Sequence, residues 1–138
     1  MKKLVFRPGD GEPLRMPGQT APRGWEIVVD PKGVGARQLS FGVQDVDVGS
    51  HIPIHMHDKE EEILFFWGGK GKVIVEDEEF EVFPGCTAFL PIDVWHGVVN
   101  TGDEPLRLTW CFSPPGYEEE FRRMTSTGVD HTPPPKSG

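Results

Sequence analysis

The chain has 138 residues, 36% of them hydrophobic, and carries a formal net charge of −8 at pH 7. This length predicts one domain, and the negative charge argues against nucleic acid or an anionic membrane surface as partner, because both bind positively charged surfaces. Seventeen glycines and fourteen prolines are many for a helical protein, and they favour short strands joined by tight turns. We therefore expect an all-β fold.

Residues 1–24 combine proline, glycine and charge without periodicity. We expect them to form an N-terminal arm that adds little to the core unless it docks on the rest of the domain. Within this arm, MKKLVFRP has too short an apolar stretch for a signal peptide, which needs roughly 7 to 15 apolar residues. No apolar run approaches the roughly 18 residues of a membrane span, and Cys86 and Cys111 form no C-x-x-C pair. A cytoplasmic protein without a disulfide framework is expected.

The next segments carry strand signals. GWEIVVDP (24–31) ends at Pro31, and in ARQLSFGVQDVDV (36–48) Leu39, Phe41 and Val43 share one face, which predicts a half-buried strand. HIPIHMH (51–57) also alternates, and this spacing puts His51, His55 and His57 on one face.

Shorter apolar runs bounded by turn residues complete the pattern, at EILFFW (62–67), KVIVED (72–77), EFEVFPG (79–85), TAFLP (87–91), WHGVVN (95–100) and LRLTWCF (106–112). About nine short strands at this spacing indicate a sandwich or a small barrel, and we expect the barrel to span residues 25–116.

The C-terminal part changes character. YEEEFRRM (117–124) predicts a short amphipathic helix with Tyr117, Phe121 and Met124 on its inner face. Residues 125–138 are rich in Ser, Thr, Pro and Gly and predict a disordered tail, in which His131 is expected to be inert.

Two histidines at positions i and i+2 of a strand point the same way and can share one ion. His55 and His57 are therefore a candidate metal clamp, although such a pair alone is more often a surface feature. A carboxylate after a turn and a third imidazole from a neighbouring strand would complete a mixed N/O site. That donor set suits Fe, Mn, Ni, Cu or Zn better than Ca or Mg.

Two longer stretches extend the clamp. The first runs Gly49-x5-His55-x-His57-x4-Glu62-x6-Gly69, and the second runs Gly85-x5-Pro91-x-Asp93-x2-His96-x3-Asn100. The chain here resembles a single-domain cupin, whose motifs are G-x5-H-x-H-x3or4-E-x6-G and G-x5-P-x-G-x2-H-x3-N. Every named position is matched except one, where Asp93 replaces glycine. Glycine there usually has a positive φ, which Asp tolerates better than most residues, so we expect the turn to be kept.

The resemblance implies a cupin-type double-stranded β-helix, or jelly-roll barrel, that binds one divalent transition-metal ion inside. Carried over residue by residue, the implied ligands are His55, His57, Glu62 and His96. Glu61 with Gly68 fits the same motif with the shorter spacer. Glu62 is preferred because Gly69-Lys70-Gly71 then supplies the G-x-G turn that often ends the motif.

The same register predicts a pocket around the ion. If Glu62 points inward, its alternate neighbours on the strand do so too and form apolar walls. His51 is a candidate for the barrel mouth or else an ordinary exposed histidine, and each of two arginines either holds an anionic group or is a surface residue. The candidate pocket residues are His51, Leu64, Phe66, Arg37 and Arg107.

The resemblance implies a metal-dependent enzyme for a small molecule, with a dioxygenase acting on a small oxygenated compound as the first hypothesis. Alternatives are a non-redox isomerase or lyase that uses the metal as a Lewis acid, and a ligand-binding or sensory module without turnover. Phe65 and Trp67 lie on the outer face of the predicted strand and need a cover. We therefore expect a homodimer, as is frequent among cupins.

Overall fold

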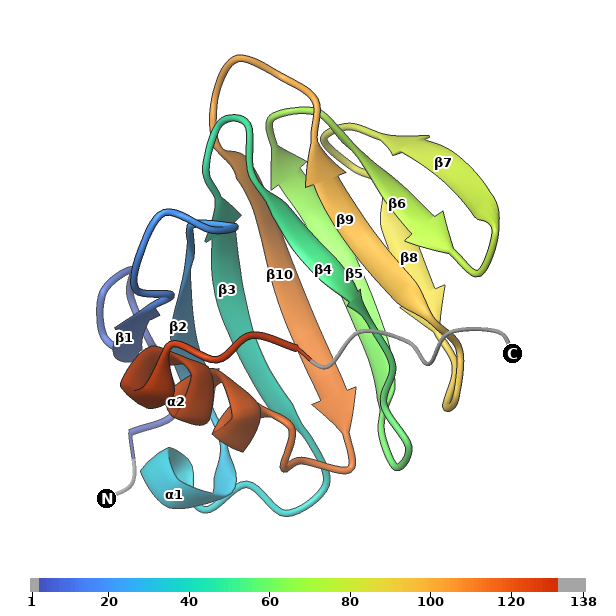
Figure 1. Ribbon diagram of the computed structural model, residues 1–138. Coiled ribbons are helices and arrows are strands. Elements are labelled where there is room, and N and C mark those ends of the chain that lie inside the picture. Colours follow the sequence, from blue (N-terminus) through green and yellow to red (C-terminus); the bar gives the residue numbers. More distant parts are fainter. Residues whose placement is uncertain (1–2, 132–138) are drawn as a thin grey trace.

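The computed structural model describes residues 3–131. Strands of this part of the chain form two antiparallel sheets that face each other (Figure 1), with strand orders β1-β2-β3-β10-β5-β8 and β4-β9-β6-β7. The element bounds are β1 Glu12–Arg15, β2 Arg23–Val29, α1 Pro31–Val34, β3 Ser40–Val46, β4 His51–His55, β5 Glu61–Gly68, β6 Gly71–Val75, β7 Glu78–Val82, β8 Thr87–Leu90, β9 His96–Asn100, β10 Leu106–Ser113 and α2 Glu118–Thr127.

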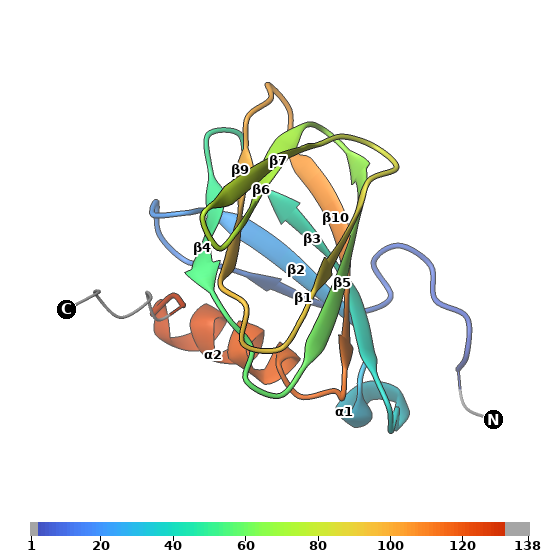
Figure 2. The same cartoon turned by 90° about the vertical axis from the view of Figure 1, so that its right-hand side faces the viewer.

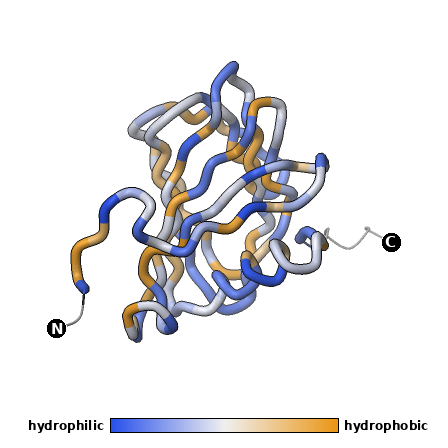
Figure 3. The backbone as a smooth tube through the Cα atoms, turned by 90° about the vertical axis from the view of Figure 1, so that its left-hand side faces the viewer, coloured by the Kyte–Doolittle hydropathy of each residue, from blue (hydrophilic) through white to orange (hydrophobic). Residues whose placement is uncertain are grey.

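The chain crosses from one sheet to the other at most of its turns after β3, and this gives the jelly-roll barrel that the sequence predicts. Hydrophobic and hydrophilic segments alternate along the strands (Figure 3), because each strand has one inner and one outer face. Along β5, for example, Glu62, Leu64 and Phe66 are buried while Phe65 and Trp67 are exposed, as the register predicts. Within residues 3–131, neither helix is long and apolar enough to cross a membrane.

The N-terminal arm docks on the barrel. β1 pairs with β2, with Leu14 opposite Trp25, and adds an edge strand to the larger sheet. Met16 is buried in the core and Arg23, the first residue of β2, is completely buried. The arm therefore contributes a strand and core contacts, and the barrel begins before residue 25.

β3 turns its more polar face inward, against what its apolar alternation suggests. Ser40, Gln44 and Val46 are buried, whereas Phe41 and Val43 are only half-buried on the outer side. Gly42 also faces inward, where a Cβ would lie 2.3 Å from the Trp110 ring. The large indole takes the space that apolar side chains would otherwise need.

α2 lies at one end of the barrel (Figure 2). It presents Phe121 and Met124 to the core, and the Phe121 ring stacks on Trp25 at 5.1 Å between centroids. The amphipathic prediction is confirmed, but the helix continues to Thr127 and ends at Gly128, which has a φ of 73°. The prediction of disorder is therefore wrong for residues 125–131, and residues 132–138 of the predicted tail lie outside the described residues.

Candidate metal centre

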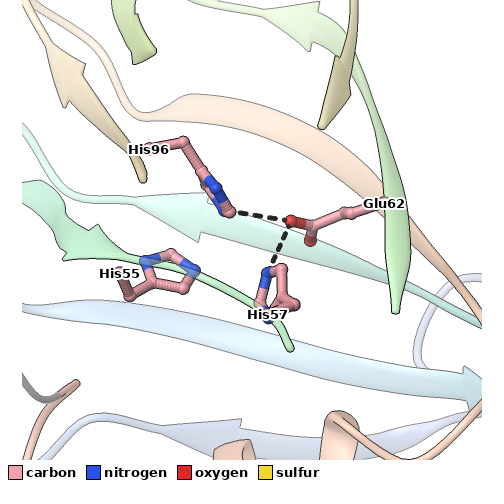
Figure 4. A group of neighbouring side chains, drawn as sticks. All are labelled: His55, His57, Glu62 and His96. Carbon is pink, nitrogen blue, oxygen red and sulfur yellow. Dashed lines mark hydrogen bonds and ion pairs between the residues drawn. The ribbon is translucent and has the colours of Figure 1, made fainter. Parts of the chain in front are cut away.

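Four polar side chains meet inside the barrel. His55 ends β4, His57 follows two residues later, Glu62 lies on β5, and His96 begins β9. All four are buried, and one ligand atom from each lies within 4.8 Å of those of the others. Figure 4 shows His57 and His96 directed at the carboxylate, with His55 beside them on the side away from Glu62. The structure thus brings together the four residues that the two motifs select, while Glu61 is exposed.

A β-bulge turns His55 toward this cluster. His51 pairs with Val99 and Ile52 with Val98, but His55 pairs with His96, so β4 contains one residue more than β9 between these pairs. An extra residue reverses the face that the following side chains present. The expectation that His51 shares a face with His55 is therefore wrong, and His51 is exposed.

The turn before β9 positions His96. Asp93 has a φ of 65°, and its N–H donates to the His57 carbonyl at 2.8 Å. Aspartate thus adopts the left-handed conformation that glycine usually supplies in this motif, as the sequence predicts. The backbone on both sides of the cluster is joined by this hydrogen bond.

Backbone carbonyls orient two of the imidazoles. His55 Nδ1 lies 2.7 Å from the Pro53 carbonyl oxygen, and His96 Nδ1 lies 3.0 Å from that of Val94. A carbonyl only accepts, so each Nδ1 carries the proton and each Nε2 of the neutral ring keeps its lone pair. This outer hydrogen bond is the usual way in which metal-binding histidines are held.

The carboxylate of Glu62 faces the Nε2 atoms of His57 and His96. Its Oε1 atom lies 3.1 Å from His57 Nε2 and 3.4 Å from His96 Nε2. Burial alone would raise the pKa of Glu62, but interactions with the two imidazoles lower it to about 2, so the group is ionised at neutral pH. Because a lone pair and a carboxylate repel, a positive charge between Nε2 and Oε1, either a proton or a metal ion, stabilises the cluster.

Burial also favours the neutral form of the His55 imidazole. It lowers the pKa of His55 well below its usual value, and the neighbouring His131, His96 and His57 lower it further. A neutral ring is the form that binds metals. The donor set, three nitrogens and one carboxylate oxygen, fits a transition-metal ion.

His131 covers the cluster, although we expected it to be inert. Its imidazole lies parallel to that of His55, with ring centroids 3.8 Å apart, and Tyr117 Oη lies 2.9 Å from its Nδ1. Nothing in the sequence around His131 marks this role. Its position depends on the ion pair between Asp130 and the buried Arg23, residues 107 positions apart.

A small cavity adjoins the cluster, with a volume of about 10 Å³, roughly the space that one water molecule needs. Leu64, as predicted, and Gln44 contribute to its wall, while Phe121 and His131 close it from the C-terminal segment. Gln44 was not predicted as a wall residue, because the apolar side chains of its strand lie on the opposite face.

The other predicted pocket residues lie elsewhere. Phe66 is completely buried in the core on the same face as Leu64. Arg37 is exposed, and Arg107 lies on the outer side of β10, where it pairs with Asp45 and its guanidinium lies over the Trp67 ring. The structure therefore brings neither arginine to the cluster, because Arg107 occupies an outward-facing position of β10 and Arg37 lies at an exposed position before β3.

Comparison with known proteins agrees with the fold and the cluster. The family model described as Cupin domain matches residues 42–112, which is about half of the chain and includes both motifs. The chain belongs to the cupin family.

Three relatives illustrate the likeness. An uncharacterised protein of Methanocaldococcus jannaschii is 36% identical over 75 residues, which are 54% of this chain and 60% of that protein. Protein SchB of Streptomyces halstedii is 28% identical over 81% of this chain and 83% of its own length. The solved oxalate decarboxylase of Lactobacillus farciminis is 29% identical with a TM-score of 0.69, over 81% of this chain and 33% of that chain.

Proposed function

We propose that the cluster binds one divalent transition-metal ion, chosen from Fe, Mn, Ni, Cu and Zn, through His55, His57, Glu62 and His96. The observation that supports this most directly is His96, whose Nδ1 is engaged by the Val94 carbonyl while its buried Nε2 has no hydrogen-bond partner among residues 3–131. A buried, unpartnered nitrogen beside a carboxylate is destabilising without a cation. The same atoms form a ligand set when a metal is present.

We further propose that the protein is a metal-dependent oxidoreductase, specifically a dioxygenase that acts on a small oxygenated organic molecule. Four protein ligands leave coordination positions open, and a bound redox metal would supply Lewis acidity and electron transfer there. The chain itself orients the imidazoles and excludes bulk water through Tyr117, Phe121 and His131. An oxygenated substrate is supported by the similar chain named oxalate decarboxylase.

The test combines metal analysis with oxygen measurement. Protein purified without added metal is analysed by mass spectrometry for metals, and then screened in an oxygen electrode with small organic acids, enols and phenols. Bound iron, copper, manganese or nickel together with substrate-dependent oxygen uptake supports the dioxygenase. Zinc with turnover but no oxygen uptake points to a Lewis-acid isomerase or lyase, and ligand binding without turnover points to a binding module.

A homodimer is the assembly that we propose. Four apolar side chains on the outer face of β5 and β8 are between 41% and 56% exposed, namely Ile63, Phe65, Trp67 and Phe89. Exposed apolar patches of this kind are typical of interfaces. Light scattering should give twice the monomer mass, and Phe65→Ser should reduce it, whereas Phe83→Ser, at an exposed position outside this face, should not. A cytoplasmic location likewise remains a prediction from the sequence.

A further inference from the structure

The cluster has no room for a substrate while the C-terminal segment stays in place. The adjoining cavity of about 10 Å³ is of the size of one water molecule, and an organic ligand of even six heavy atoms needs several times that space. One of the groups that line this cavity must therefore move before a ligand can reach the cluster.

His131 is the lining group that is held least by regular structure. It lies three residues beyond Gly128, where α2 ends, and belongs to no helix or strand. By contrast, Gln44 and Leu64 lie within paired strands, and Phe121 is fixed in the core by its stack on Trp25. Movement of residues 129–131 opens the cluster without breaking a sheet.

One ion pair ties this segment to the barrel. Arg23 donates from Nη1 to Asp130 Oδ2 at 2.9 Å and from Nη2 to Oδ1 at 2.5 Å, and its Nη1 also donates to the Ala21 carbonyl. Arg23 is completely buried, whereas the Asp130 side chain is 20% exposed. The fixed half of the pair thus belongs to β2 and the movable half to the segment that carries His131.

The space that His131 fills has a definite shape. Its floor is the face of His55, which lies 4° from parallel at 3.8 Å, and its edge is the Tyr117 hydroxyl, at 2.9 Å from His131 Nδ1. The Tyr117 ring is itself within 9° of the His131 plane. Any group that takes this place meets an aromatic face below and a hydroxyl at its rim, so flat rings that carry an oxygen or nitrogen atom fit it best.

We propose that the place of the His131 imidazole is a subsite for the planar part of the ligand, a conjugated ring bearing a hydroxyl or carbonyl oxygen that stacks on His55 and hydrogen-bonds Tyr117. The ligand displaces His131 when the Arg23–Asp130 pair opens. This inference rests on the proposed function in that the ligand is the substrate of the metal centre. The subsite itself consists of side chains that are present without metal.

The experiment uses metal-free, full-length protein and two neutral probes, phenol and cyclohexanol, which share a six-membered ring and one hydroxyl and differ in flatness. Dissociation constants are measured by NMR with labelled histidines, since a ring stacked on His55 shifts its ring-proton signals. The variants are His131→Ala, which empties the place, and Asp130→Asn, which loosens the segment and keeps the imidazole. Glu119→Gln, which removes an exposed carboxylate that pairs with Arg122 within α2 and outside residues 129–131, is the matched control.

Phenol is expected to bind about tenfold more tightly to both His131→Ala and Asp130→Asn than to the unchanged protein. In both variants the displacement of residues 129–131 opposes binding less. Phenol should also bind about three- to tenfold more tightly than cyclohexanol to His131→Ala, the gain expected from aromatic stacking. Glu119→Gln should leave both probes unchanged.

Equal gains for phenol and cyclohexanol would overturn the flat subsite, and so would phenol binding that leaves the His55 signals unshifted. If circular dichroism shows that His131→Ala does not fold, the test rests on Asp130→Asn. An unchanged phenol affinity of Asp130→Asn then refutes the displacement of His131. Phenol binding requires no metal, so its outcome is independent of metal analysis. A protein that binds phenol as expected but retains no metal would refute the proposed function alone.

Discussion

His55 lies directly opposite His96 in the antiparallel pair of β4 and β9, where an unbroken ladder continued from His51 and Val99 would place Trp95. The bulge that causes this shift turns the imidazoles of His55 and His96 toward each other, with ring centroids 4.3 Å apart. A candidate metal centre is thus formed at an irregularity of the sheet. Bulges are common next to functional sites for this reason.

The first prediction concerns the histidine ligands. His57→Ala and His96→Ala should each lower the metal content of the purified protein to less than about a tenth of its original value. Changes to residues that only support a ligand already weaken metal binding by about 10- to 100-fold, and the loss of one of four ligands should weaken it more. Metal content is measured by mass spectrometry, and circular dichroism checks that the fold is kept.

The matched control for these variants is His51→Ala, which removes an exposed imidazole at the start of β4, on the other side of the bulge from the cluster. It should keep the full metal content. Unchanged occupancy in both ligand variants would refute the ligand assignment, and loss of metal in His51→Ala would show that the effect is not specific to the cluster.

The second prediction separates two neighbouring carboxylates. Glu62→Gln removes the only carboxylate of the buried cluster and should weaken metal binding by about 100-fold or more, because an anionic ligand is replaced by a neutral one. Glu61→Gln, at an exposed position one residue earlier, should change it by less than about twofold. Competition with a chromogenic chelator measures both constants. Equal effects of the two changes would mean that the register of β5 in solution differs from that described here.

The third prediction is the pH dependence of the metal-free protein. Burial, followed by nearby positive charges, lowers the pKa values of His55 and His131 well below 6.5. The unfolded chain therefore binds protons that the folded protein does not, and stability present above pH 6.5 is lost as the pH falls below it. The loss should reach up to about 1.4 kcal/mol per pH unit for each histidine.

Urea unfolding between neutral pH and pH 5 measures this slope. His131→Ala should reduce it, because one of the two titrations is removed. A stability that stays constant over this range would contradict the neutral, buried state of both rings. At lower pH, protonation of Glu62 adds a further loss as the pH falls from 4.5 toward about 2.

The fourth prediction gives the last residue of the second motif a structural role. The Asn100 side chain donates to the carbonyls of Val46, Asp47 and Glu104, and its Oδ1 accepts from Gly102 N–H. Asn100→Ala should destabilise the protein by about 2 to 4 kcal/mol, because buried backbone carbonyls lose their donors. Metal content should be unaffected in the folded fraction. Asp103→Ala, in the same turn but exposed, should be nearly neutral in urea unfolding.

Several elements of this structure follow from local patterns. The alternation along residues 62–67 predicts which side chains of β5 face inward, and both motifs predict the four residues that meet at the cluster. The positive φ of Asp93 also follows, because the motif expects glycine at a position where only a few other residues are tolerated. Each of these features depends either on residues within about ten positions of one another in the chain, or on the spacing of the cupin motifs.

Other elements depended on contacts that alternation does not describe. Period two fails across β4, where the extra residue of the bulge exposes His51. Along β3 the period of two is kept, but the buried face is the opposite of the apolar one, because Trp110 from β10 fills the space above Gly42. The polar face of β3, with Gln44, is turned inward as a result. A strand's own residues cannot specify which face is buried when a neighbouring strand supplies the bulk.

The sequence by itself determined an all-β sandwich or barrel, because strand periodicity is a local property of the chain. Its resemblance to the two cupin motifs implied the jelly-roll class and the four residues of the cluster. Only the tertiary structure decided what covers the cluster. His131 reaches His55 because Arg23, buried at the start of β2, pairs with Asp130 near the other end of the described chain. The energy of that pair depends on burial and on a distance between remote residues, and neither quantity is written in the residues that surround His131.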